Sequence, residues 1–139
     1  MILGIGIDLC GITRIRRSVK RFGERFTSKF CTERERHWID ASSDPGLLYA
    51  QSFAAKEALA KALGTGFGDE IGPFDLELLH MRPPIPVLTT GAAAERLKAL
   101  TPNQWSAEIH LSVGTCLDFA SASAVVSAVA RIPSSRRRR

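Results

Sequence analysis

A long alanine-rich helix is predicted near the middle of the chain, within the segment "LLYAQSFAAKEALAKALGTGFG" at residues 47–68. The helix should begin at Gly46 or Leu47 and end at Leu63, because Gly64 suits the left-handed residue that terminates many helices. Three glycines within residues 64–68 then stop it. Its contact surface is expected from Leu48, Phe53, Ala54, Ala58 and Leu59.

The N-terminal part of the chain predicts a strand followed by a basic helix. The apolar, β-branched run "MILGIGIDL" is typical of a buried strand that ends near Asp8, with Gly11 breaking it. Over residues 12–22, apolar side chains recur at helical spacing while five basic residues take the other faces. Arg14, Arg17 and Arg21 follow the three- and four-residue spacing of a single stripe.

The remaining pattern mixes helices with strands and favours an α+β fold. Thr32 and Glu35 resemble a capping box that opens a helix through about Ile39, before a loop at "ASSDPG". Further along, "FDLELLH" predicts a strand, "MRPPIPVL" a proline-rich connection into another strand, and "GAAAERLKAL" a short helix. The segments "AEIHLSV" and "FASASAVVSAV" predict a strand pair joined around residues 114–118.

Composition indicates one globular domain in a reducing compartment. The 139 residues are 45% hydrophobic with a mean hydropathy of -0.00. The three cysteines have no metal-ligand spacing and are interpreted as buried apolar residues, and no signal peptide or membrane span is evident, so we expect a cytoplasmic protein. Four arginines at 136–139 supply most of the net charge of +5, which predicts a domain over residues 1–130 and a basic tail over 131–139.

Asp8, Glu57 and Lys61 are the candidate functional residues. Glu57 and Lys61 lie four residues apart on the predicted helix and share one face. A carboxylate on a hydrophobic strand, such as Asp8, is costly to bury unless it is paired or binds a cation. Asp8 and Glu57 could therefore hold Mg²⁺ beside phosphates, with Lys61 neutralising phosphate charge. Equally compatible with the sequence is a structural role, in which Asp8 caps a turn and Glu57 pairs with Lys56 or Lys61.

Three segments together resemble the motifs of holo-acyl-carrier-protein synthases, which are small phosphopantetheinyl transferases of fatty-acid synthesis. They are "GIGIDLCGITRIRR", "FAAKEALAKALGTGFG" and "IHLSVG", in the family's order, and the resemblance extends to about Val129. It implies a single α+β domain with an antiparallel sheet, assembly into homotrimers, and transfer of 4′-phosphopantetheine from coenzyme A to a serine of apo acyl carrier protein. Adenosine 3′,5′-bisphosphate would be released, and Mg²⁺ would be the cofactor.

The resemblance also assigns roles to individual residues. Asp8 and Glu57 match the metal-binding carboxylates. Lys61 matches the lysine that approaches the phosphates of coenzyme A, and Gly64, Thr65 and Gly66 match the loop beside the nucleotide. The stripe of Arg14, Arg17 and Arg21 matches the surface that receives the acidic helix of the carrier protein. Glu57 is the candidate base for the serine proton, either directly or through a water on the metal.

Two departures from the family pattern keep alternative functions open. The chain has Thr115 and Cys116 where many members have a histidine and an acid, and Asp118 could substitute. Pro83 and Pro84 stand where a basic residue and a proline are common, with Arg82 one position early. A weakened paralogue that binds coenzyme A or carrier protein is one alternative. A nucleic-acid-binding protein is less favoured, because no recognised reader motif accompanies the basic residues. We expect no nucleic-acid or membrane partner.

Overall fold

The computed structural model describes residues 1–132, which form an α+β domain around a three-stranded antiparallel sheet. The strands of this sheet are β1 (Ile2–Gly11), β4 (Trp105–Cys116) and β5 (Phe119–Ala130), in the order β1-β5-β4. A second, two-stranded sheet pairs β2 (Leu76–Leu78) with β3 (Val87–Thr89). The predicted fold class and antiparallel sheet are confirmed.

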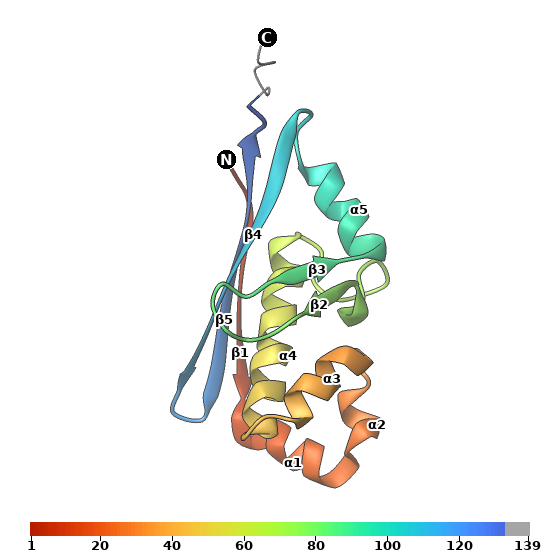
Figure 1. The fold of residues 1–139 in the computed structure, drawn as a ribbon, viewed down its shortest axis with the longest axis vertical. Coiled ribbons are helices and arrows are strands. Elements are labelled where there is room, and N and C mark those ends of the chain that lie inside the picture. Colours follow the sequence, from red (N-terminus) through yellow and green to blue (C-terminus); the bar gives the residue numbers. More distant parts are fainter. Residues whose placement is uncertain (133–139) are drawn as a thin grey trace, which may run out of the picture.

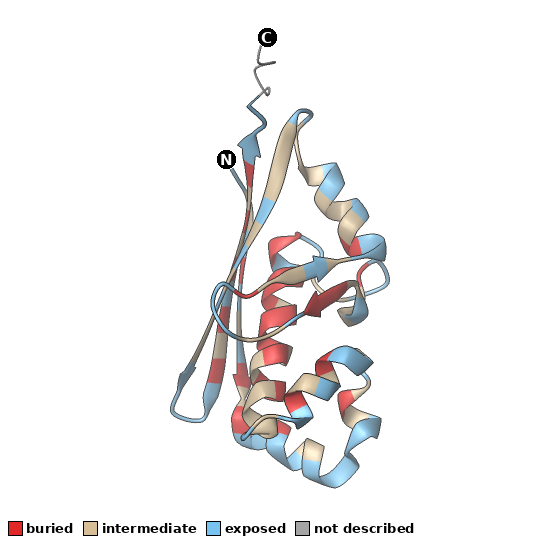
Figure 2. Cartoon of the chain, viewed as in Figure 1, coloured by how far each residue is buried: buried red, intermediate tan, exposed pale blue. Residues whose placement is uncertain are grey.

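The helices pack mainly on one face of the large sheet (Figure 1). They are α1 (Ile12–Phe22), α2 (Glu24–Thr27), α3 (Glu33–Asp40), α4 (Pro45–Ala62) and α5 (Gly91–Leu100), with a 3₁₀ turn η1 (Pro73–Asp75) before β2. Helix α4 runs along the sheet and contacts all three of its strands, while α1 to α3 gather at one end. Figure 2 shows α4 as the most buried helix, whereas α1 and α2 expose their outer faces.

Small side chains bring α4 close to the sheet. The buried positions of β5 are alanines and one valine, and they alternate with more exposed residues along the strand: Ala120, Ala122, Ala124, Val126 and Ala128. The alanines of α4 pack against them because neither surface carries bulky side chains.

Strand β1 differs from the predicted buried strand in two respects. It continues to Gly11 instead of ending near Asp8, and one of its faces is exposed. Ile5, Ile7 and Leu9 are 67%, 67% and 64% exposed. Side chains alternate along a strand, and α4 covers only the face that carries Gly6 and Asp8. The predicted strand is confirmed, but its predicted burial is wrong for one of its two faces, because α4 covers the other face only.

Most helix boundaries are predicted well by the sequence, and the failures lie where the elements are short. The helix over 12–22, the capping box of Thr32 and Glu35, and the left-handed Gly64 are confirmed. Helix α2 was not predicted. The strand predicted over residues 74–80 shrinks to the three residues of β2 because η1 occupies its start. Most of the predicted tail of 131–139 lies outside the described residues.

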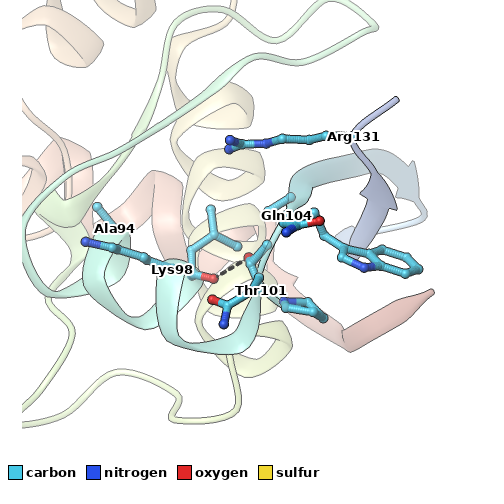
Figure 3. Close-up of a pocket in the computed structure, with 10 residues that line it drawn as sticks. Ala94, Lys98, Thr101, Gln104 and Arg131 are labelled. Carbon is cyan, nitrogen blue, oxygen red and sulfur yellow. Dashed lines mark hydrogen bonds between the residues drawn. The ribbon is translucent and has the colours of Figure 1, made fainter. Parts of the chain in front are cut away.

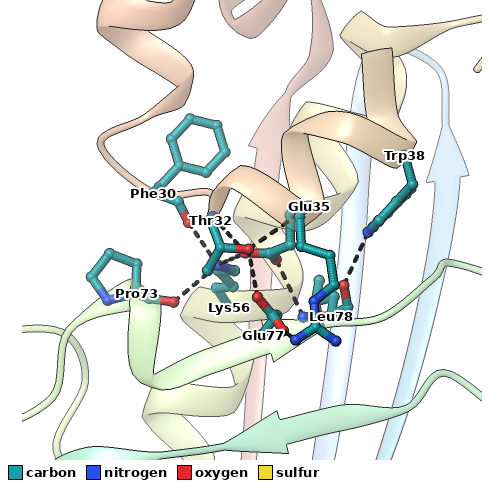
Figure 4. Close-up of polar contacts among 9 residues, drawn as sticks. Phe30, Thr32, Glu35, Trp38, Lys56, Pro73, Glu77 and Leu78 are labelled. Atoms are coloured by element: carbon teal, nitrogen blue, oxygen red, sulfur yellow. Dashed lines mark hydrogen bonds and ion pairs between the residues drawn. The ribbon is translucent and has the colours of Figure 1, made fainter. Parts of the chain in front are cut away.

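A buried ion pair joins α3 and η1 to α4 (Figure 4). Lys56 is 1% exposed and donates to Glu35 Oε1 (2.6 Å), to the Phe30 carbonyl (2.7 Å) and to the Pro73 carbonyl (2.9 Å). Glu35 also accepts from the backbone N–H groups of Thr32 and Leu78. All three ammonium donors of Lys56 are therefore satisfied, which is what a buried charge requires.

Candidate active site

The fold brings Asp8 of β1 to Lys61 of α4. The Lys61 ammonium donates to Asp8 Oδ1 at 2.7 Å and to the Ile7 carbonyl at 3.1 Å. The Asp8 side chain is 16% exposed and that of Lys61 is 47% exposed. The alternative in which Glu57 pairs with Lys56 or Lys61 is wrong, because Lys56 is held by Glu35 and Lys61 by Asp8.

Glycines in β1 create this approach. A Cβ atom on Gly4 would lie 1.9 Å from the Ala62 carbonyl oxygen, and one on Gly6 would lie 2.0 Å from that of Ala58. No side chain fits at either position, so the backbones of β1 and α4 are in contact beside Asp8. The sequence motif "GIGID" carries this signal as glycines spaced two apart on one strand face, whereas the sequence prediction gave these glycines no role.

Glu57 lies one turn before Lys61 and completes the charge cluster. Burial raises the pKa of Glu57, the negative charge of Asp8 raises it further, and Lys61 opposes both effects. The pKa of Lys61 is also raised, chiefly by its hydrogen bond to Asp8. The two carboxylates thus interact with the same ammonium group. The cluster of Asp8, Glu57 and Lys61 carries a net negative charge when all three are ionised.

This donor set fits a hard divalent cation that also binds substrate oxygens. Within residues 1–132, no group of three or more His, Cys, Asp or Glu side chains is arranged to hold a metal ion. Mg²⁺ commonly uses only one or two carboxylates and completes its coordination with phosphates and water. Asp8 and Glu57 meet that requirement.

The glycine-rich loop begins directly after α4, close to Lys61. Gly64 and Gly66 have φ of 85° and 64°, values that favour glycine. The Gly66 N–H donates to the Ala60 carbonyl at 3.0 Å, which folds the loop back onto the helix. Thr65 between them is exposed. The predicted loop residues therefore sit together at the end of the helix that carries Glu57 and Lys61.

Arg96 of α5 is a cation at this loop that sequence reasoning missed. Its Nε donates to the Leu63 carbonyl at 3.0 Å, and its Nη2 would lie 3.3 Å from a Cβ on Gly64. The guanidinium thus satisfies a free carbonyl at the end of α4 and adds positive charge beside the glycines. No local pattern predicts it, because 33 residues separate it from Leu63.

The predicted arginine stripe forms one side of α1. Arg14, Arg17 and Arg21 line a shallow hollow of about 430 Å³ together with Phe22. The Arg21 guanidinium lies 5.1 Å from the centre of the Phe22 ring, a cation–π geometry. Arg16 lies outside this hollow and makes a two-point contact with Asp44 instead. Arg14, Arg17 and Arg21 therefore share one surface of α1, and Arg16 is not part of it.

Asp118, the candidate replacement acid in the hairpin between β4 and β5, lies at the start of α1. Asp118 Oδ1 accepts from the N–H and hydroxyl groups of Thr13, at 3.1 and 2.7 Å, so Asp118 caps the start of α1. Thr115 accepts a hydrogen bond from Gln51 at 3.1 Å. Cys116 is exposed, which corrects the expectation that every cysteine is buried, because it lies next to the turn of the hairpin.

A separate hollow of about 380 Å³ lies between the end of α5 and the start of β4 (Figure 3). Lys98, Thr101, Gln104 and Arg131 are among the residues that line it, and none of the predicted site residues does. Among residues 1–132, no helix combines the length and apolar character needed to span a membrane.

Comparisons with known proteins identify a consistent set of relatives. The model of the 4′-phosphopantetheinyl transferase superfamily matches residues 4–128. The holo-[acyl-carrier-protein] synthase of Methylobacterium sp. (strain 4-46) is 45% identical over 93% of this chain and 96% of its own. The crystal structure of the synthase of that name from Neisseria meningitidis has a TM-score of 0.77 at 29% identity, covering 91% of this chain and 99% of that one. The Helicobacter pylori synthase in complex with coenzyme A has a TM-score of 0.68 at 32% identity, covering 88% and 99%.

Proposed function

The chain belongs to the 4′-phosphopantetheinyl transferase superfamily, and we propose that it transfers 4′-phosphopantetheine from coenzyme A to a serine of apo acyl carrier protein. The products are holo acyl carrier protein, which serves fatty-acid synthesis, and adenosine 3′,5′-bisphosphate. The observation that carries this proposal is the convergence of Asp8, Glu57 and Lys61 beside a glycine-rich loop. Carboxylates, a lysine and free backbone groups suit chemistry on a pyrophosphate.

Asp8 and Glu57 are the proposed ligands of Mg²⁺. When bound there, Mg²⁺ would neutralise negative charge that develops on the pyrophosphate of coenzyme A. Lys61 is the proposed partner of a phosphate, and its half-exposed ammonium supports this role. Gly64, Thr65 and Gly66 let the backbone approach the nucleotide closely, with Arg96 adding charge at the same loop.

Glu57 is also the proposed proton acceptor. The attacking serine hydroxyl must lose a proton as it bonds to the β-phosphorus, and the bond from that phosphorus to the bridging oxygen breaks. A carboxylate beside the proposed metal and phosphate positions is a group that can take up such a proton. Glu57 can accept the proton directly or through an intervening water.

Arg14, Arg17 and Arg21 are proposed to dock the carrier protein. Three cations outnumber the single carboxylate, Asp118, around this hollow, so it presents net positive charge to an acidic helix. Such complementarity raises the association rate and fixes orientation. Phe22 in the same hollow offers an apolar contact.

We further infer a homotrimer with active sites shared between neighbours. Support comes from the exposed apolar side chains of β1, including Ile5, Ile7 and Leu9, which another subunit could cover. We infer a cytoplasmic location, which suits the free cysteines Cys10, Cys31 and Cys116.

A mass measurement tests the proposed reaction. The protein is incubated with coenzyme A, Mg²⁺ and an apo acyl carrier protein, and the carrier should gain the mass of one phosphopantetheine. A carrier with its acceptor serine changed to alanine is the control. Binding of coenzyme A without any gain in carrier mass would instead favour the weakened paralogue, and the altered residues Thr115 and Cys116 give that outcome a structural basis.

A further inference from the structure

Lys61 already contacts one oxygen of the carboxylate that the proposed metal needs. Its ammonium contacts Asp8 Oδ1 at 2.7 Å and the Ile7 carbonyl at 3.1 Å. The contact lies at the edge of the core, where the Asp8 side chain is only 16% exposed. A charged hydrogen bond in such a position is stronger than one in open water. A divalent ion that binds Asp8 must therefore compete with a cation that is tethered to the site.

The two lysines of α4 differ in their freedom to exchange partners. Lys56 is buried, and its three donors are satisfied by Glu35 and two carbonyls. Lys61 makes two contacts within residues 1–132, so one of its three donors has no acceptor there. Its side chain is 47% exposed. Lys61 can move because its ammonium is already half exposed and the partly accessible Asp8 carboxylate can take a metal ion in its place, whereas Lys56 would leave the fully buried Glu35 carboxylate unpaired.

We infer that Lys61 holds the place of the metal ion on Asp8 in the free protein and leaves it for the phosphates of coenzyme A, so that the metal and coenzyme A bind cooperatively. The inference rests on the proposed function, and it adds an order to the events at that site. A pyrophosphate carries more negative charge than one carboxylate, so it draws the ammonium away. Asp8 is then free for the metal. Linkage requires the reverse effect as well: a bound metal displaces Lys61 and strengthens coenzyme A binding.

Metal affinity of the full-length protein is the direct test. Binding of Mn²⁺, a paramagnetic substitute for Mg²⁺, is measured by electron paramagnetic resonance with and without saturating coenzyme A. Without coenzyme A, Lys61→Met should bind Mn²⁺ at least about fivefold more tightly than wild type, the lower end of typical coupling factors. Its gain in affinity on adding coenzyme A should be smaller. Lys61→Arg keeps a cation for Asp8 and should resemble wild type, as should Lys98→Met, which removes an exposed lysine on α5.

A second measurement follows the lysine itself in wild-type protein. With ¹⁵N-labelled lysine, the Nζ signal that is absent from Lys61→Arg belongs to Lys61. Coenzyme A added without a divalent ion should shift this signal, because the ammonium changes its partner. The shift needs no catalysis and does not depend on whether Lys61→Met folds.

The outcomes separate this inference from the proposed function. Unchanged or weaker Mn²⁺ binding by folded Lys61→Met, or an unmoved Lys61 signal while coenzyme A binds, overturns the exchange even if the carrier protein is modified normally. Failure of wild-type protein to bind coenzyme A or modify a carrier overturns the proposed function instead.

Discussion

A Cβ atom added to Gly6 would lie 2.0 Å from the carbonyl oxygen of Ala58. The backbones of β1 and α4 are thus in direct contact at the level of the candidate site. Asp8 lies two residues further along the same face of β1, and Lys61 lies three residues beyond Ala58 on α4. The salt bridge between Asp8 and Lys61 depends on this contact, because any side chain at position 6 would push the strand and helix apart.

Gly6→Ala should therefore destabilise the protein and impair the site together. We expect the free energy of unfolding to fall by about 3 kcal/mol or more, since backbone atoms must move to admit the methyl group. Urea denaturation measures this loss. Gly72→Ala is the matched control, because its Cβ would meet open space, and it should change stability by no more than about 0.5 kcal/mol. Equal effects of the two changes would contradict the contact.

The two carboxylates of the site should be needed for activity more than for folding. Asp8→Asn and Glu57→Gln each remove a charge from the proposed metal site, so phosphopantetheine transfer should fall on the order of 100-fold or more. Initial rates at saturating carrier protein measure the loss. Glu95→Gln, which changes an exposed glutamate of α5, should leave the rate unaltered. Wild-type turnover in either site variant would reject the assignment.

Glu57 should make the metal-free protein less stable as the pH rises. Burial and the charge of Asp8 raise the pKa of Glu57 in the folded protein above its value in the unfolded chain. A group of this kind stabilises the fold fully below its unfolded pKa, and that contribution is lost as the pH rises through the folded pKa. Glu57→Gln should therefore be more stable than wild type at pH 7 in a chelator, and the difference should vanish below about pH 4. Denaturant titrations of both proteins at pH 7 and below about pH 4 measure the difference in unfolding free energy. If Glu57→Gln were less stable than wild type at pH 7, the predicted direction of the effect would be wrong.

Breaking the buried pair of Lys56 and Glu35 should be costly, and removing both charges should be less so. Lys56→Met leaves the Glu35 carboxylate buried without its cation, which should cost about 3–5 kcal/mol of unfolding free energy. The double variant with Glu35→Gln should recover part of that loss, because Gln is neutral and keeps a side-chain oxygen that can accept from the backbone N–H groups beside it. Arg16→Met removes an exposed pair with Asp44 and should cost no more than about 1 kcal/mol. A double variant no more stable than Lys56→Met would show that the charges themselves are not the cause.

Reversing charge on α1 should weaken carrier recognition selectively. Arg14→Glu with Arg21→Glu should raise the KM for acyl carrier protein by about tenfold or more and flatten its salt dependence, because the attraction between the surfaces is screened by ions. The affinity for coenzyme A should change little. Lys98→Glu on α5 and deletion of residues 133–139 are controls expected to leave the KM unchanged. If the deletion abolished recognition while the reversals did nothing, the proposed docking surface would be wrong.

Local patterns in the sequence were sufficient for most of the helices. The helix over 12–22, the capping box at Thr32 and the stop at Gly64 depend on side chains and dihedral preferences within a few residues of each other. The exposed face of β1 could not be predicted in this way, because an apolar run looks the same whether one face or both are covered. Which face α4 covers is a property of the packed domain.

The same distinction between local pattern and packing applies to the candidate site. The sequence by itself determined the chemistry: which carboxylates, lysine and glycines are present, and the single stripe formed by Arg14, Arg17 and Arg21. Only the tertiary structure decided the partners. Lys61 pairs with Asp8 and not with Glu57, and Lys56 pairs with Glu35. Asp118 binds the start of α1, and Arg96 binds the glycine loop. Each of these contacts joins residues at least 21 positions apart. Helical spacing fixes which side chains share a face, but an ion pair forms with whatever charge the packed backbones bring within reach.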